Sequence, residues 1–315
     1  MQNIVFLDRD SLLANVRPPA FEHAWRDYPA TQPGGVLERL AGATIAITNK
    51  VPVRAADIAR LPDLKMIAVA ATGTDNVDLA ACRERGIVVS NIRNYSVVAV
   101  PEHVFAMILA LRRNVRAYCA DVDAGLWQKS STFCLFNHPI GDLAGSKLGI
   151  VGYGALGHKV AQLGRAFGMQ VCVASRSPVQ DADVTNLPME QVLRTCDVVS
   201  LHLPLNEQTR NMIGARELAM MKPTALLINT ARGGLVDEAA LAQALKDGVI
   251  GGAGFDVLSK EPPLADNPLL GVHQPNFILT PHVAWASVGA MQTLADMLVD
   301  NVEAFVAGKP LNVVA

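Results

Sequence analysis

Three ionisable residues, Arg232, Glu261 and His282, stand in loops after predicted strands, where a parallel sheet presents groups to a ligand. Their types match the needs of reducing a 2-oxo acid by hydride transfer. A cation must hold the carboxylate and polarise the carbonyl, and an acid must protonate the developing alkoxide. Arg232 suits the first task and His282 the second, while Glu261 would orient the imidazole and keep it protonated near neutral pH.

Sequence spacing alone does not show that these three side chains meet. Each has a plainer interpretation: Arg232 as a surface ion-pair partner, Glu261 as a loop carboxylate, and His282 as one of seven histidines. The segments around them must therefore decide between the two interpretations.

The segment KLGIVGYGALG, residues 147–157, predicts a strand, a tight turn and the start of a helix. Gly152 would let the chain turn, Gly154 would let backbone approach a pyrophosphate, and Gly157 would let the helix pack on the strand. The first N–H groups of the helix would face the anion. An ordinary glycine turn is the alternative, but a helical pattern to residue 167 and a strand at 170–175 complete a βαβ unit. This context favours a dinucleotide site.

The tip of that second strand reads Ser175-Arg176-Ser177, where an NAD site usually carries an acid. No carboxylate would repel a 2′-phosphate there, and a guanidinium is a planar set of donors suited to phosphate. NADP(H) is therefore favoured over NAD(H). The alternative is that Arg176 is a solvated loop residue.

Composition excludes several classes of protein. The chain has 315 residues, is 50% hydrophobic and 18% charged, and carries a net charge of −2, which argues against nucleic acid or an anionic membrane as partner. Asp8, Arg9 and Asp10 occupy the place of a signal-peptide core, and no apolar run approaches membrane length, so we expect a cytoplasmic protein. The five cysteines are scattered without a C-x-x-C pair, which predicts reduced thiols, and we expect no metal.

The first ninety residues predict a small α/β unit, in which a polar, proline-bearing passage follows the first strand and runs through Pro33. Strands are expected at 4–7, 43–48, 64–71 and 86–90, and helices at 35–40, 54–60 and 77–85. Asn49-Lys50 and the loop from Thr72 to Thr74 follow strands. Lys50 and Asn49 are candidates for contacting a polar substrate tail, with packing or surface exposure as the alternative.

The remainder predicts a long helix at 101–118, then the glycine-bearing unit, and a final helix at 287–307. Further strands are expected at 198–203, 225–230, 249–257 and 277–280, with a helix at 238–247. Trp285, three residues after His282, could form a wall of the pocket or simply pack. The whole predicts two doubly wound α/β units with a ligand cleft between them.

Five motifs carry a resemblance to a known family: ATGTDNVD from residue 71, VGYGALG from 151, NTARGGLVD from 229, GFDV from 254 with Glu261-Pro262, and TPH from 280. In this order they resemble the D-isomer-specific 2-hydroxyacid dehydrogenase family over nearly the whole chain. Residues 48–50 and 281–287 are similar to its glycerate dehydrogenase and hydroxypyruvate reductase branch.

This resemblance implies roles for the residues. Arg232 would orient the substrate, Glu261 would pair with His282, His282 would exchange the proton, and backbone at Thr72, Gly73 and Thr74 would hold the carboxylate. The positions expected to contact the cofactor are Gly152, Gly154, Ala155, Leu156, Gly157, Ser175, Arg176, Ser177, His202, Pro204, Thr230, Ala231, Arg232, Asp256 and His282.

The resemblance also implies a flavodoxin-like substrate domain at 1–98 and 287–315, a Rossmann domain at 99–286, and a homodimer built around the helix after residue 100. The leading hypothesis is reduction of hydroxypyruvate or glyoxylate to D-glycerate or glycolate. A D-lactate or 3-phosphoglycerate dehydrogenase is the alternative, although phosphoglycerate would need further cations, and the chain ends at Ala315 with no appended regulatory domain. A non-catalytic dinucleotide sensor resembling transcriptional corepressors would not need the Arg, Glu and His set.

Overall fold

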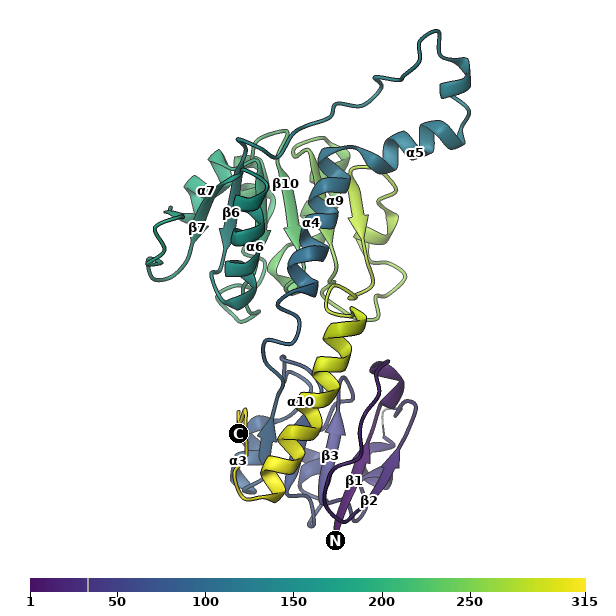
Figure 1. Cartoon of the computed structure of the whole chain (residues 1–315), viewed down its shortest axis with the longest axis vertical. Helices are drawn as coiled ribbons and strands as arrows, with labels where there is room; N and C mark the ends of the chain where they lie inside the picture. The colour runs from purple at the N-terminus through teal and green to yellow at the C-terminus, as the bar shows by residue number, and fades with distance from the viewer. Residues whose placement is uncertain (33) are drawn as a thin grey trace. The chain divides into compact units, whose positions relative to one another are not determined.

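In the computed structural model, which describes residues 1–32 and 34–315, the chain divides into two compact units. Unit 1 comprises Met1–Ser96 and Ala286–Ala315, and unit 2 comprises Val97–Trp285. Each unit contains one sheet, and all strand pairs in both sheets are parallel, so the predicted fold class of two α/β units is confirmed (Figure 1). None of the described helices has the length and hydropathy that a membrane crossing needs.

Unit 1 contains a five-stranded sheet in the order β2-β1-β3-β4-β5, the flavodoxin-like arrangement. All side chains of β3 and β4 are buried, as expected for parallel strands covered on both faces. The strand order reverses between β1 and β3, so ligands are expected at the carboxyl ends of these two strands. The elements of unit 1 are β1 (Gln2–Phe6), η1 (Arg9–Ser11), β2 (His23–Asp27), α1 (Val36–Arg39), β3 (Ile45–Thr48), α2 (Ala55–Ile58), β4 (Met66–Val69), α3 (Leu79–Glu84), β5 (Val88–Ser90) and α10 (Val288–Val306).

Strand β2 corrects the expectation of an irregular passage before Pro33. It pairs with β1 from Gln2 opposite His23 to Phe6 opposite Asp27. As an edge strand it has no buried residue, so its sequence lacks the apolar run by which a central strand is found. Pro33 itself lies outside the described residues.

Unit 2 contains a seven-stranded sheet in the order β12-β11-β10-β9-β6-β7-β8, the doubly wound order of a dinucleotide-binding domain. Its strand order reverses between β6 and β9. The elements of unit 2 are α4 (Ala99–Arg112), α5 (Val115–Asp123), η2 (Trp127–Lys129), β6 (Lys147–Val151), α6 (Ala155–Ala166), β7 (Gln170–Ala174), β8 (Thr185–Asn186), α7 (Met189–Thr195), β9 (Val198–Leu201), α8 (Ala215–Met220), β10 (Leu226–Asn229), η3 (Gly233–Leu235), α9 (Glu238–Lys246), β11 (Gly252–Phe255), η4 (Pro268–Gly271) and β12 (Phe277–Leu279).

Two apolar clusters cover this sheet. In one, Val160 of α6 packs with Ile150 of β6, and in the other, Val192 of α7 packs with Leu201 of β9 and Leu227 of β10. All five side chains are fully buried. Burial of each side chain contributes about 1.5–3 kcal/mol to the stability of the fold. The packed helices and strands hold in place the strand ends from which the loops of the site extend.

The predicted helix at 101–118 is instead two helices, α4 and α5, separated at Asn114. Asn114 has φ 49°, a left-handed conformation that asparagine tolerates better than most residues, and its side chain donates to Pro139 O at 2.5 Å. The chain therefore turns where the apolar pattern alone suggested continuity. Helix α5 and the segment after it stand away from the sheet of unit 2 (Figure 1).

Candidate active site

The glycine loop of unit 2 has the predicted strand, turn and helix. Gly152 has φ 94°, and a Cβ there would lie 2.6 Å from His202 O. A Cβ on Gly157 would lie 2.3 Å from Gly152 O, so these two glycines are needed for packing. A Cβ on Gly154 would meet no atom within 4 Å, because this glycine caps α6 beside open space. The first N–H groups of α6, at Ala155 and Leu156, therefore have room for a pyrophosphate.

The next two strand ends, after β9 and β10, carry His202 and Thr230. The His202 ring shares a hydrogen bond with Ser200 Oγ at 2.9 Å, and burial lowers its pKa to about 4, so the imidazole is neutral at physiological pH. Thr230 Oγ1 is buried and has no hydrogen-bond partner among residues 1–32 and 34–315. An unpaired buried hydroxyl at a strand end of this sheet fits a site that a polar cofactor completes.

The loop after β7 presents the residues predicted to select the cofactor. Ser175, Arg176 and Ser177 are all exposed, and Ser175 Oγ donates to Ser177 O. Within the described part of the chain, Arg176 makes no hydrogen bond or ion pair with another residue. The guanidinium is therefore available to an anion at this strand end.

Arg232 lies in the loop after β10, in a turn built by Asn229. The buried Asn229 side chain accepts from Ala231 N at 3.1 Å and donates to Arg232 O at 2.8 Å. Arg232 Nη1 donates to Ala231 O at 2.7 Å. The next residue, Gly233, packs so closely that a Cβ would lie 1.9 Å from Leu258 C, which joins this loop to the one after β11.

The loop after β11 carries Glu261 and is anchored by Glu238 of α9. The Glu238 carboxylate is 9% exposed and accepts from Ser259 N at 2.5 Å, from Ser259 Oγ at 2.9 Å and from Asn267 Nδ2 at 2.7 Å. Glu261 Oε1 in turn accepts from Leu258 N at 2.9 Å. Sequence reasoning did not identify Glu238, because nothing in a helical Glu indicates that it will bind a distant loop.

Glu261 and His282, which the family resemblance implies as partners although they lie in separate loops, form a direct pair. His282 Nδ1 donates to Glu261 Oε2 at 2.5 Å, with side-chain exposures of 27% and 34%. Since Nδ1 is engaged by the carboxylate, Nε2 is the nitrogen left to exchange a proton.

The loop that carries His282 is held by Asp256, a carboxylate only 1% exposed. Asp256 accepts from Thr280 Oγ1 at 2.5 Å, Val283 N at 2.9 Å and Ala284 N at 2.8 Å. His282 itself has φ 56°, an uncommon conformation outside glycine that the surrounding bonds must maintain. Asp256 was predicted as a cofactor contact, and the structure shows its carboxylate bonded to the histidine loop.

His103 of α4 completes this network and was missed by sequence reasoning. Its Nε2 lies 3.0 Å from Thr280 Oγ1 and 3.8 Å from Asp256 Oδ1. Because Thr280 donates its single hydroxyl proton to Asp256, Nε2 of His103 must donate to Thr280. Trp285 also braces the loop, since its Nε1 donates to His282 O at 3.0 Å.

In unit 1, the two strands at the reversal of the sheet are followed by Asp8, two residues after β1, and by the turn from Asn49 to Val51, directly after β3. Asp8 is 5% exposed, and its carboxylate accepts from the backbone N–H groups of Asn49 at 2.9 Å, Lys50 at 2.7 Å and Val51 at 3.2 Å. Asn49 is buried, and its Nδ2 donates to Ser11 Oγ at 3.1 Å. Of the two predicted substrate contacts, Asn49 is buried and Lys50 is exposed.

The loop after β4 is held at Thr72. Thr72 Oγ1 donates to Ile92 O at 2.7 Å, and Asn91 Nδ2 donates to Thr72 O at 2.7 Å. The N–H groups of Gly73 and Thr74 make no hydrogen bond within the part of the chain that the structure describes. Two unpaired donors at a strand end can accept a carboxylate.

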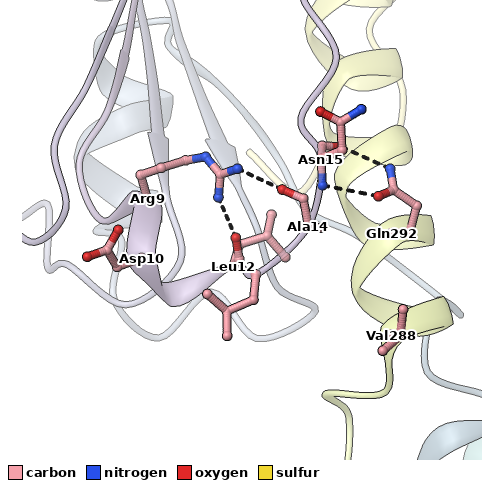
Figure 2. A pocket seen from close by; sticks show the side chains of 8 residues that line it. Arg9, Asp10, Leu12, Ala14, Asn15, Val288 and Gln292 are labelled. Carbon is pink, nitrogen blue, oxygen red and sulfur yellow. Dashed lines mark hydrogen bonds between the residues drawn. The ribbon is translucent and has the colours of Figure 1, made fainter.

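Unit 1 also has an open hollow of about 710 Å³ between the loop after β1 and the start of α10 (Figure 2). Several of its polar groups are bonded to one another: Arg9 donates to Leu12 O and Ala14 O, and the Gln292 amide pairs with the backbone of Asn15. None of the predicted site residues lines it.

Comparison with known proteins agrees with this arrangement. Residues 105–284 match the family model described as D-isomer specific 2-hydroxyacid dehydrogenase, NAD binding domain. A glycerate dehydrogenase of Methylorubrum extorquens is 58% identical over 99% of both chains, and a hydroxypyruvate reductase of Blautia hydrogenotrophica is 34% identical over 89% of this chain and 87% of its own. An acyclic imino acid reductase solved with NADPH and D-arginine is 28% identical, with a TM-score of 0.85 over 100% of both chains.

The matched model lies within unit 2 and includes the glycine loop, Glu261 and His282, while the glycerate dehydrogenase of Methylorubrum extorquens is similar over 99% of the chain and therefore over both units. The chain is an oxidoreductase that interconverts 2-oxo acids and D-2-hydroxy acids with a nicotinamide dinucleotide. It belongs to the D-isomer-specific 2-hydroxyacid dehydrogenase family, in the glycerate dehydrogenase branch.

Proposed function

We propose that this enzyme reduces hydroxypyruvate and glyoxylate to D-glycerate and glycolate, with His282 as the proton donor. The observation that carries the proposal is the bond of 2.5 Å from His282 Nδ1 to Glu261 Oε2. A carboxylate in this position stabilises the protonated ring, so that His282 Nε2 can deliver a proton to an oxygen at neutral pH. Relatives named for glycerate dehydrogenase and hydroxypyruvate reductase activity support the choice of substrate.

Each residue then has one task. The glycine loop would hold the dinucleotide, whose nicotinamide would supply the hydride for C2 of the substrate. Arg232 binds the carboxylate and polarises the carbonyl, and His282 Nε2 gives its proton to the oxygen as the C–O double bond becomes an alcohol. Glu261 keeps the imidazole in place and compensates its charge. In unit 1, the N–H groups of Gly73 and Thr74 are, among the described residues, unpaired donors suited to a carboxylate, and exposed Lys50 is a cation suited to a polar group.

The preferred cofactor is NADP(H). The support is Arg176, exposed at the end of β7 where the adenosine ribose of a dinucleotide is bound in this fold. A guanidinium can bind a 2′-phosphate with two parallel hydrogen bonds, and this strand end lacks the acid that would bind a ribose hydroxyl pair.

The enzyme works as a homodimer that uses α5 and the segment after it. This segment exposes large apolar side chains, including Phe133 at 90%, Phe136 at 86% and Trp127 at 52%. Such a group of exposed apolar residues is typical of a surface covered by a partner. Sedimentation velocity of the purified enzyme measures the oligomeric state, and a monomer at micromolar concentration would exclude this assignment.

The experiment that tests the proposed function is a set of initial rates with hydroxypyruvate, glyoxylate and pyruvate, each with NADPH and with NADH. We expect the highest kcat/KM with hydroxypyruvate and NADPH. Arg176→Ala should reduce kcat/KM for NADPH by about 10- to 100-fold and leave that for NADH within about twofold, because a charge-assisted bidentate contact is lost. Equal rates with both cofactors, unchanged in Arg176→Ala, would show that Arg176 is a solvated loop residue.

A further inference from the structure

Tyr153, the residue between the first two glycines of the phosphate loop, binds the loop that follows β7. Its hydroxyl donates to Asp181 Oδ2 at 2.7 Å, and its ring contacts His158 edge-on with centroids 5.6 Å apart. The hydrogen bond lowers the pKa of Asp181 and contributes, after burial, to a raised pKa of Tyr153. The glycine loop and the loop after β7 are thus joined by a side chain that the dinucleotide fingerprint leaves unspecified.

Arg165 of α6 contacts the same loop. Its Nη1 lies 3.7 Å from Asp181 Oδ2, and its Nε lies 4.0 Å from Asp183 Oδ2. Asp181 is the more enclosed of the two carboxylates, with a side-chain exposure of 20% against 70% for Asp183. Its second oxygen accepts from Asp183 N at 3.0 Å, which turns the loop back toward α6.

These contacts pair the acidic side chains of the loop with neighbouring groups and leave its basic side chain without a partner among the described residues. Residues 175–186 contain three charged side chains, and the two acidic ones, Asp181 and Asp183, face Arg165, with Tyr153 and His158 also beside Asp181. Arg176 alone is left without a protein partner within the described residues. The uncompensated charge at the end of β7 is therefore positive, although the loop carries one cation and two anions.

We propose that Tyr153 and Arg165 are specificity-determining residues: they bind Asp181 against α6, keep its carboxylate from the ribose 2′ position, and so leave Arg176 to select a 2′-phosphate. This inference rests on the proposed preference for NADP(H) and extends it. A released Asp181 would repel a 2′-phosphate, compete for Arg176, and accept hydrogen bonds from the ribose hydroxyls of NAD(H).

The test measures cofactor binding rather than turnover. Dissociation constants of NADPH, NADH and adenosine 2′,5′-bisphosphate are determined by titration calorimetry for the wild-type enzyme and for Tyr153→Phe, which removes the hydroxyl and keeps the ring. We expect the Kd of NADPH and of the bisphosphate to rise about 3- to 10-fold, and the Kd of NADH to stay within about twofold or fall.

A double variant distinguishes an effect of the charge on Asp181 from an effect of a changed loop structure. In Tyr153→Phe combined with Asp181→Asn, the released side chain carries no charge, so NADPH binding should return to within about twofold of the wild type. Asp181→Asn alone should bind NADPH at least as tightly as the wild type. If the double variant stays as weak as Tyr153→Phe, the effect comes from a disordered loop and the proposal is wrong.

Tyr28→Phe in unit 1 is the matched control and should leave all three constants unchanged. The proposed role of Tyr153 and Arg165 is judged by the ratio of the dissociation constants of NADH and NADPH in Tyr153→Phe, compared with the same ratio in the wild type. An unchanged ratio overturns the proposal. The preference itself is judged separately, by the ratio in the wild type and in Arg176→Ala. The experiment therefore distinguishes an error in the proposed cofactor preference from an error in the proposed role of Tyr153 and Arg165.

Discussion

The two halves of the sheet in unit 2 end in loops of different character. After β6, β7 and β9, the chain presents backbone N–H groups, open space beside Gly154 and the unpaired Arg176. After β10, β11 and β12, buried carboxylates bind the loops: Glu238 holds the one with Glu261, and Asp256 holds the one with His282. The first half leaves contacts to be made by a cofactor. The second half makes most of its contacts within the protein, and among the described residues its buried Thr230 hydroxyl is an exception without a hydrogen-bond partner.

This difference follows from what each half must do. A dinucleotide brings its own phosphates and ribose hydroxyls, so its site needs room and unpaired donors. Proton and hydride transfer depend on geometry at the level of one ångström, so the reacting side chains need fixed rotamers and a fixed backbone. The unusual φ of 56° at His282 is maintained because Thr280, two residues before it, and Val283, directly after it, are hydrogen-bonded to Asp256.

The largest effect is expected from removing the proposed proton donor, His282, in the half of the sheet whose loops are bound by buried carboxylates. His282→Ala should reduce kcat with hydroxypyruvate by about 10³-fold, because the general acid is lost, while the Kd of NADPH changes by less than about twofold. Steady-state rates and titration calorimetry measure the two quantities. His273→Ala, at an exposed histidine outside the site, is the control and should behave as the wild type. Unimpaired turnover in His282→Ala would show that another group donates the proton.

A pH-dependent effect on stability is expected at His202, in the loop after β9. Burial lowers its pKa to about 4 from an ordinary value of 6.5, so the unfolded chain binds a proton in this range that the folded chain does not. The contribution of His202 to stability is complete above pH 6.5 and is lost as the pH falls toward 4, by up to about 3 kcal/mol. Urea unfolding at pH 7 and pH 4.5 should show a smaller decrease in His202→Asn than in the wild type. Equal decreases would contradict the shifted pKa.

A smaller decrease in kcat is expected when the support of the His282 loop is weakened and the reacting side chains are left unchanged. Asp256→Asn replaces one acceptor oxygen by a donor that faces Thr280 or the backbone N–H groups, so the His282 loop loses part of its support. We expect kcat to fall about 30-fold with a smaller change in KM, together with about 2 kcal/mol of lost stability.

The matched control for that variant is Asp237→Ala, which removes the carboxylate that caps α9 by accepting from Ala239 N and Ala240 N. It should cost about 1 kcal/mol of stability and leave kcat unchanged. If Asp256→Asn also loses stability without loss of kcat, its role is structural and the network does not position His282.

Much of the fold could be predicted from the sequence because its signals are local. The apolar runs of β3, β4, β9 and β10 and the glycines from 152 to 157 each lie within one short segment. The failures have the same origin: β2 is an exposed edge strand without an apolar run, and the break at Asn114 depends on one residue adopting a left-handed conformation. The short elements β8, α7 and α8 were not predicted either.

The sequence by itself determined the two α/β units, the position of the glycine loop and the identity of the residues that could carry the chemistry. Only the tertiary structure decided that Glu261 bonds to His282, that Asp256, Thr280 and His103 form one network, and that Tyr153 and Arg165 bind Asp181. The physical reason is distance along the chain. A strand or a turn is specified by neighbouring residues, whereas these contacts join residues 16 to 177 positions apart, and they form only when packing brings the strand ends together.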